Sequence, residues 1–179
     1  MLKITVPEME YFDEVNNIIF TKPAETLELE HSLVALQQWE SRWEKPFLSD
    51  VPKTMEESTD YIRCMTLNKV DDSIYQRLTY ENREEINHYI DAKMTATTFS
   101  DSGNGSKKKS VTTAEIIYYW MLAFNIPSEY RYWHLQQLLT LIQVCNIKNN
   151  PPKKMGRREL MNRNRALNEA RKQKMHTKG

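Results

Sequence analysis

The fold is decided by residues 116–124, IIYYWMLAF, which form the longest uninterrupted apolar run in a chain of 179 residues. The run follows Thr112 and Glu115, whose spacing matches a capping box at the start of a helix. A helix that is apolar on nearly every side must be buried on nearly every side. We therefore predict a buried helix that ends before Pro127, because proline cannot continue a helix.

A second apolar helix is predicted directly after the first. Ser128 is suited to cap it, and apolar residues then recur at helical spacing from Leu135 to Ile147. Because the connection is short, the two helices are expected to form an antiparallel hairpin around which the other helices pack.

The helical pattern extends upstream of this pair. Trp39 and Trp43 lie four residues apart ahead of Pro46, which is expected to end their helix. Thr54 and Glu57 form another capping box, which opens the next helix. The predicted structural core includes all four tryptophans, Trp39, Trp43, Trp120 and Trp133.

The N-terminal residues carry the pattern of short strands instead. Residues 2–6 and 26–30 alternate apolar and polar side chains, and residues 11–12 and 18–20 flank Asn16-Asn17. Paired asparagines tolerate the left-handed backbone of a tight turn, so a hairpin is predicted there. The fold class is therefore α+β, mainly α, with a small N-terminal antiparallel β-sheet, a helical bundle and a basic C-terminal helical arm.

Composition divides the chain into one globular domain, residues 1–149, and an arm, residues 150–179. The domain is predicted to be β-rich over 1–31 and helical over 32–149. Residues 93–111 hold small polar residues and lysines with almost nothing apolar, which predicts a mobile loop.

The arm concentrates a positive charge that the domain lacks. Residues 150–179 hold ten basic and two acidic residues, a balance of +8, whereas residues 1–149 hold 15 basic and 22 acidic, a balance of −7. A charged arm with little apolar surface indicates a partner. The predicted partner-binding residues are Lys153, Lys154, Arg157, Arg158, Arg163, Arg165, Arg171, Lys172 and Lys174.

Three interpretations of the arm remain open. It could lie on an acidic protein surface, on a neighbouring copy or a separate partner; it could bind nucleic acid; or it could only aid solubility. Residues 150–179 contain no Phe, Trp or Tyr to stack on bases, so nucleic acid is possible but not favoured. Protein contact ranks first.

No pattern in the chain indicates catalysis, a metal site or a cofactor. His31, His134, Cys64 and Cys145 could meet only through the fold, and none has metal-ligand spacing. The cysteines are predicted to be reduced core residues, and carboxylates such as Glu40 to lie on solvated faces. We predict no enzyme activity, no catalytic or metal-binding residue, no cofactor and no membrane span, since a spanning helix needs about 20 apolar residues.

Aromatic residues gather around the two apolar helices, at Tyr118, Tyr119, Trp120, Tyr130, Tyr132 and Trp133. The favoured interpretation places them in the core, with hydroxyls reaching water or backbone. The alternative is a protein-binding surface, because Tyr and Trp are frequent anchors of interfaces.

Seven segments, in order along nearly the whole chain, resemble a family of tailed-phage proteins. They are residues 27–33 (LELEHSL), 39–47 (WESRWEKPF), 94–99 (MTATTF), 114–121 (AEIIYYWM), 133–142 (WHLQQLLTLI), 163–171 (RNRALNEAR) and 177–179 (TKG). The family is that of the tail assembly chaperones of long-tailed phages.

The resemblance implies a non-enzymatic helper that binds the phage tape-measure protein, keeps it soluble and recruits tail-tube subunits. It implies assembly work in the host cytoplasm, and such genes often make a second product by ribosomal frameshifting. We also expect a homo-oligomer. The alternative is a structural virion protein, as a head, connector or decoration component, that uses the arm for contacts between subunits. A sequence-nonspecific nucleic-acid binder is the third possibility.

Overall fold

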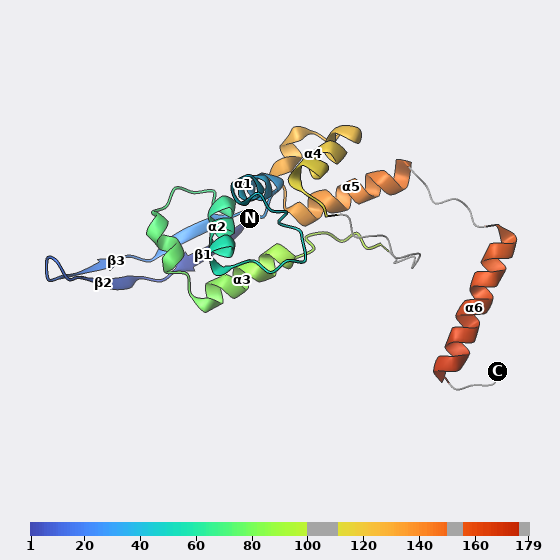
Figure 1. The fold of residues 1–179 in the computed structure, drawn as a ribbon, viewed down its shortest axis with the longest axis horizontal. Helices are drawn as coiled ribbons and strands as arrows, with labels where there is room; N and C mark the ends of the chain where they lie inside the picture. Colours follow the sequence, from blue (N-terminus) through green and yellow to red (C-terminus); the bar gives the residue numbers. More distant parts are fainter. Residues whose placement is uncertain (100–110, 150–155, 176–179) are drawn as a thin grey trace. The chain divides into compact units, whose positions relative to one another are not determined.

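The computed structural model describes residues 1–99, 111–149 and 156–175. The fold is α+β and mainly α, with two small antiparallel sheets ahead of the helices, which confirms the predicted fold class (Figure 1). The chain forms two compact units, Met1–Cys145 and Asn146–Gly179. Across the described ranges no helix has both the length and the apolar character needed to cross a membrane.

The four strands lie where the alternating pattern predicts them. The hairpin also forms, and Asn17 in its turn takes the predicted left-handed backbone, with a φ of 52°. The strands pair as two separate antiparallel ladders, the first with the fourth and the second with the third. Their bounds are β1, Leu2–Val6; β2, Met9–Asp13; β3, Ile18–Lys22; and β4, Glu25–Leu29.

The larger of two apolar clusters packs the β1–β4 ladder against three helices and a 3-10 turn. Trp39, 1 % exposed, lies in this cluster and donates from its indole nitrogen to the Glu57 carbonyl oxygen at 2.8 Å. The Phe47 ring covers Trp39 edge-on, with ring centroids 5.0 Å apart. The elements are α1, Leu33–Trp43; α2, Met55–Met65; η1, Asp72–Gln76; and α3, Tyr80–Asp91.

The smaller cluster joins a second set of α1 residues, Leu33 and Leu36, to α4 (Ala114–Ala123) and α5 (Leu135–Asn149). Since α1 contributes to both clusters, the predicted hairpin of α4 and α5 is not the centre around which the rest packs. Ser128 opens a 3-10 turn, η2 (Ser128–Tyr132), and does not cap α5.

The prediction that α4 is buried on nearly every side is wrong. Only Ala114, Ile117 and Met121 are buried, which is one stripe of the helix, while Tyr119 is 67 % exposed and Leu122 is 78 % exposed. The helix is apolar all round because its exposed face carries apolar residues too, whereas only its buried stripe packs in the cluster with α1 and α5.

The four tryptophans occupy different environments. Trp39 confirms the predicted core, whereas Trp43 and Trp120 are half-buried at the edges of the two clusters. Trp133 is 42 % exposed and stacks on Tyr130 with ring centroids 4.0 Å apart, so its assignment to the core is wrong. Trp133 directly follows η2 and precedes α5, so it lies on neither helix of the smaller cluster.

The two predicted capping boxes have opposite outcomes. At α2 the Thr54 N–H donates to Glu57 Oε2 at 2.8 Å and the Glu57 N–H donates to Thr54 Oγ1 at 3.1 Å. At α4 the N-cap is Thr113, without a side-chain cap, so the predicted box at Thr112 does not form. The Ala114 N–H instead donates to a carboxylate from α1, Glu40, at 2.7 Å.

Candidate protein-interaction surfaces

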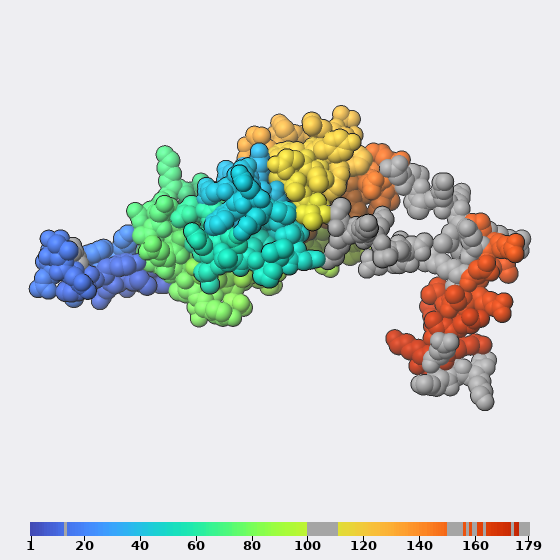
Figure 2. Space-filling model, viewed as in Figure 1, coloured from blue at the N-terminus to red at the C-terminus, as the bar shows by residue number. Residues whose placement is uncertain are grey.

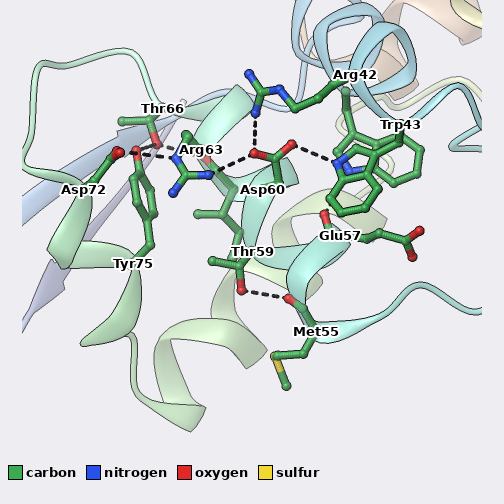
Figure 3. Close-up of polar contacts among 12 residues, drawn as sticks. Arg42, Trp43, Met55, Glu57, Thr59, Asp60, Arg63, Thr66, Asp72 and Tyr75 are labelled. Atoms are coloured by element: carbon green, nitrogen blue, oxygen red, sulfur yellow. Dashed lines mark hydrogen bonds and ion pairs between the residues drawn. The ribbon is translucent and has the colours of Figure 1, made fainter.

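A buried carboxylate, Asp60, lies at the centre of a polar network between α1 and α2. It accepts hydrogen bonds from Arg42, from Trp43 Nε1 at 2.9 Å and from Arg63 Nη1 at 2.9 Å (Figure 3). Burial opposes ionisation, but these hydrogen bonds and the charge of Arg42 hold the pKa of Asp60 below its usual value. Asp60 therefore joins α1 to α2 as a fixed anion.

Arg63 extends this network to η1. Its Nε lies 3.4 Å from Asp72 Oδ1, and its guanidinium lies over the Tyr75 ring, 5.0 Å from the centroid (Figure 3). The Tyr75 hydroxyl donates in turn to Thr66 Oγ1 at 3.0 Å. Each of these groups contacts another element of the fold, which is the arrangement of a structural brace.

The fold brings together two of the four candidate metal ligands, His31 and His134, whose rings lie 5.1 Å apart. His31 Nδ1 is 2.6 Å from the Tyr61 hydroxyl, and His134 Nε2 is 3.0 Å from the Tyr89 carbonyl oxygen. Cys64 and Cys145 are both free thiols. Within residues 1–99, 111–149 and 156–175, no group of three or more such side chains is placed to hold a metal ion.

We expect the protein to lose stability in mild acid because of His31. Burial, and then the neighbouring His134, lower the pKa of His31 from 6.5 to about 3. The unfolded chain therefore binds a proton that the folded chain excludes, so this stability is complete above pH 6.5 and is lost as the pH falls toward 3. His31 should lower the free energy of unfolding by about 2 kcal/mol between pH 7 and pH 5.

Urea denaturation at several pH values measures this loss. His31→Gln cannot titrate and should flatten the slope between pH 6.5 and pH 4, while the exposed His88→Gln should keep the parent slope. An unchanged slope in His31→Gln would assign the acid sensitivity to other groups.

The β2–β3 hairpin is the first surface that exposes apolar side chains. Phe12 and Ile19 face each other across the ladder and are 57 % and 66 % exposed. On the other face, Ile18 is 57 % exposed and the Tyr11 and Phe20 rings stack at 5.5 Å. The hairpin projects from the helices of its unit (Figures 1 and 2), and in the described structure it pairs with no third strand.

A buried arginine holds the base of this hairpin. Pro7 and Pro23 interrupt the ladder between the two strand pairs, because proline has no N–H to donate. The Arg77 side chain, 0 % exposed, donates to both proline carbonyl oxygens, at 3.3 Å and 2.9 Å, and to Glu25 Oε1 at 2.5 Å. These bonds fix where the hairpin leaves the body of the unit.

Exposed apolar side chains also occur on α4 and at the end of η2, and we refer to these residues as the aromatic surface of α4 and η2: Tyr119, Leu122, Tyr132 and Trp133. Their exposed fractions are 67 %, 78 %, 55 % and 42 %. Arg131 lies over the Tyr132 ring, 4.8 Å from the centroid, and orients it by a hydrogen bond to the hydroxyl at 2.8 Å. For Tyr119, Tyr132 and Trp133 the core interpretation of the aromatic concentration is wrong, and the alternative of a protein-binding surface stays a prediction.

The basic arm contains the predicted helix, α6 (Arg157–Met175). Of the predicted partner-binding residues, five have described side chains, and all five are exposed: Arg158, Arg165, Arg171, Lys172 and Lys174. Arg165 Nε pairs with Glu169 one helical turn away at 3.3 Å. Lys153 and Lys154, most of the predicted mobile loop at 93–111, and the side chains of Arg157 and Arg163 lie outside the described residues.

Sequence reasoning missed Glu40 and Arg77, because nothing in their local sequence marks them as buried. Glu40 lies between Trp39 and Ser41, and Arg77 between Gln76 and Leu78, and charged residues of this kind are usually exposed. The prediction that Glu40 lies on a solvated face is wrong, since Glu40 is 8 % exposed. Their partners lie 74 residues away for Glu40, at Ala114, and 70 residues away for Arg77, at Pro7.

Comparison with protein-family models, with curated proteins and with solved structures yields no match to this chain. The resemblance to tail assembly chaperones therefore stays a prediction from the sequence.

Proposed function

We propose that this chain is a non-enzymatic tail assembly chaperone of a long-tailed phage, which binds the tape-measure protein through the aromatic surface of α4 and η2. The observation that carries the proposal is the outward face of α4, where Tyr119 and Leu122 are more than two-thirds exposed. Exposed apolar surface of this kind marks sites of protein contact, and Tyr and Trp are the side chains most often found as interface anchors.

The basic helix α6 supplies a second kind of contact. Its exposed Arg and Lys side chains suit acidic segments of a protein partner, and salt would weaken such contacts. A partner that binds both the aromatic surface and α6 would have its apolar segments and its acidic segments covered. Recruitment of tail-tube subunits follows from the resemblance and would use surfaces that the tape-measure protein leaves free.

Co-expression of the full chain with the phage's tape-measure protein tests this proposal. Tyr119→Ser combined with Leu122→Ser should reduce the soluble complex recovered in a pull-down by about tenfold or more, since each anchor contributes about 1–2 kcal/mol. The control is Leu67→Ser, which removes a 59 % exposed apolar side chain outside the aromatic surface. Neutralising α6 with Gln at Arg165, Arg171, Lys172 and Lys174 should lower recovery at low salt and flatten its dependence on salt, because the charges that salt screens are gone.

Three outcomes would contradict the proposal. If the parent chain forms no complex, the chaperone function is excluded. If Leu67→Ser weakens the complex as much as the double variant, the aromatic surface is not the binding site. If the protein is recovered stoichiometrically from purified particles, it is a structural virion protein.

A further inference from the structure

One face of the β2–β3 hairpin combines apolar and acidic side chains. Glu10 and Phe12 are two residues apart on β2 and therefore point to the same face, opposite Thr21 and Ile19. Glu10 and the neighbouring turn residue Glu14 are both exposed. This face therefore presents an apolar pair, Phe12 and Ile19, beside the negative charge of Glu10.

A pocket with the complementary character lies elsewhere in the same unit, between α2 and α3. It has a volume of about 410 Å³ and apolar walls that include Phe47, Met55 and Ile90. Pockets of this size accept ligand-sized groups, and aromatic side chains are among the groups that gain most from such burial.

Two cations line this pocket, Lys53 and Arg83, against one carboxylate, Asp91. Lys53 Nζ lies over the Phe47 ring, 4.3 Å from its centroid, and partial burial lowers the pKa of Lys53 although Glu57 opposes this. Arg83 donates to Thr59 Oγ1 at 3.2 Å with one of its five N–H groups. An incoming carboxylate would favour the charged form of Lys53.

We propose that the hairpin of one copy docks into the α2–α3 pocket of a second copy, with Phe12 and Ile19 on the apolar walls and Glu10 facing Lys53. The charges are complementary, and both partners belong to the well-packed unit Met1–Cys145. The hairpin cannot turn back to its own pocket, because Arg77 fixes its base and it points away from the helices (Figures 1 and 2).

Such an interface is head-to-tail, since two different surfaces of the same molecule meet. Head-to-tail contacts build rings or open chains and not closed twofold dimers. This self-association is independent of the proposed chaperone function, because it requires no tape-measure protein.

A mixing experiment tests the head-to-tail contact with two full-length variants. The hairpin variant carries Phe12→Ser and Ile19→Ser, and the pocket variant carries Lys53→Glu and Met55→Glu. The hairpin side chains and Met55 are largely exposed and Lys53 is half-buried, so both variants should fold, which circular dichroism checks.

In sedimentation velocity, the parent chain should form larger species as its concentration rises to about 100 µM. Each variant alone should associate at least tenfold more weakly. Their equimolar mixture should form 1:1 dimers and nothing larger, because one intact hairpin meets one intact pocket. Leu122→Ser is the matched control and should associate as the parent chain does.

The contact is overturned if the parent chain stays monomeric throughout this range, or if Leu122→Ser weakens association as much as the hairpin variant does. Association of the pocket variant alone would instead indicate that hairpins pair with each other. An equimolar mixture of the two variants that remains monomeric would also overturn the proposed contact between hairpin and pocket.

Discussion

Replacing Trp39 with alanine is expected to lower the free energy of unfolding by about 3–5 kcal/mol, which is the typical loss when a buried aromatic side chain is truncated. Trp39 is 1 % exposed, contacts the Phe47 ring and donates to the Glu57 carbonyl oxygen on α2. Truncation would leave a cavity and remove the hydrogen bond that ties α1 to the Glu57 carbonyl oxygen of α2. Urea or thermal denaturation of the full chain measures the effect.

The other tryptophans provide graded controls for this experiment. Trp133→Ala should cost less than about 1 kcal/mol because Trp133 is 42 % exposed. Trp120 is half-buried, so its replacement should cost an intermediate amount. Equal losses at Trp39 and Trp133 would show that exposure in the folded chain does not govern these energies.

Local patterns in the sequence predicted most of the secondary structure. The alternation in residues 2–6 and 26–30 predicted β1 and β4, and the Thr54–Glu57 spacing predicted the cap of α2. These features depend on residues a few positions apart, whose interactions are present in any fold that the chain adopts.

Tertiary placement was predicted less well, because it depends on which neighbours are available. The composition of α4 shows that it is apolar all round, but not which of its residues are exposed in the fold. The same holds for Trp133. Its spacing in the sequence fits the core face of a helix, but in the structure it directly follows the 3-10 turn η2 and is exposed. The aromatic surface was therefore only the less favoured alternative at the level of sequence.

The closeness of His31 and His134 shows the same limit. The two residues are 103 positions apart, and an isolated bridge between Ser32 and His134 brings their segments together. No spacing rule for metal or catalytic sites applies across such a separation. Their burial gives them a consequence for stability in acid that neither position alone would indicate.

Replacing Glu40 with alanine is expected to lower the free energy of unfolding by roughly 3 kcal/mol, about 1.5 kcal/mol for each of two charge-assisted hydrogen bonds. Glu40 is 8 % exposed and accepts from the Phe47 N–H at 2.8 Å and from the Ala114 N–H at 2.7 Å. The second bond stands in for the missing side-chain cap of α4, and a carboxylate at a helix N-terminus is further favoured by the helix dipole.

Glu40→Gln separates the two contributions, because an amide keeps only one acceptor oxygen and has no charge. It should lose about half as much stability as Glu40→Ala, whereas Glu85→Ala on the exposed side of α3 should lose less than about 0.5 kcal/mol. Hydrogen exchange should show the loss locally, as faster exchange of the Ala114 amide. Protection of that amide in Glu40→Ala equal to the parent chain would mean that another group caps α4.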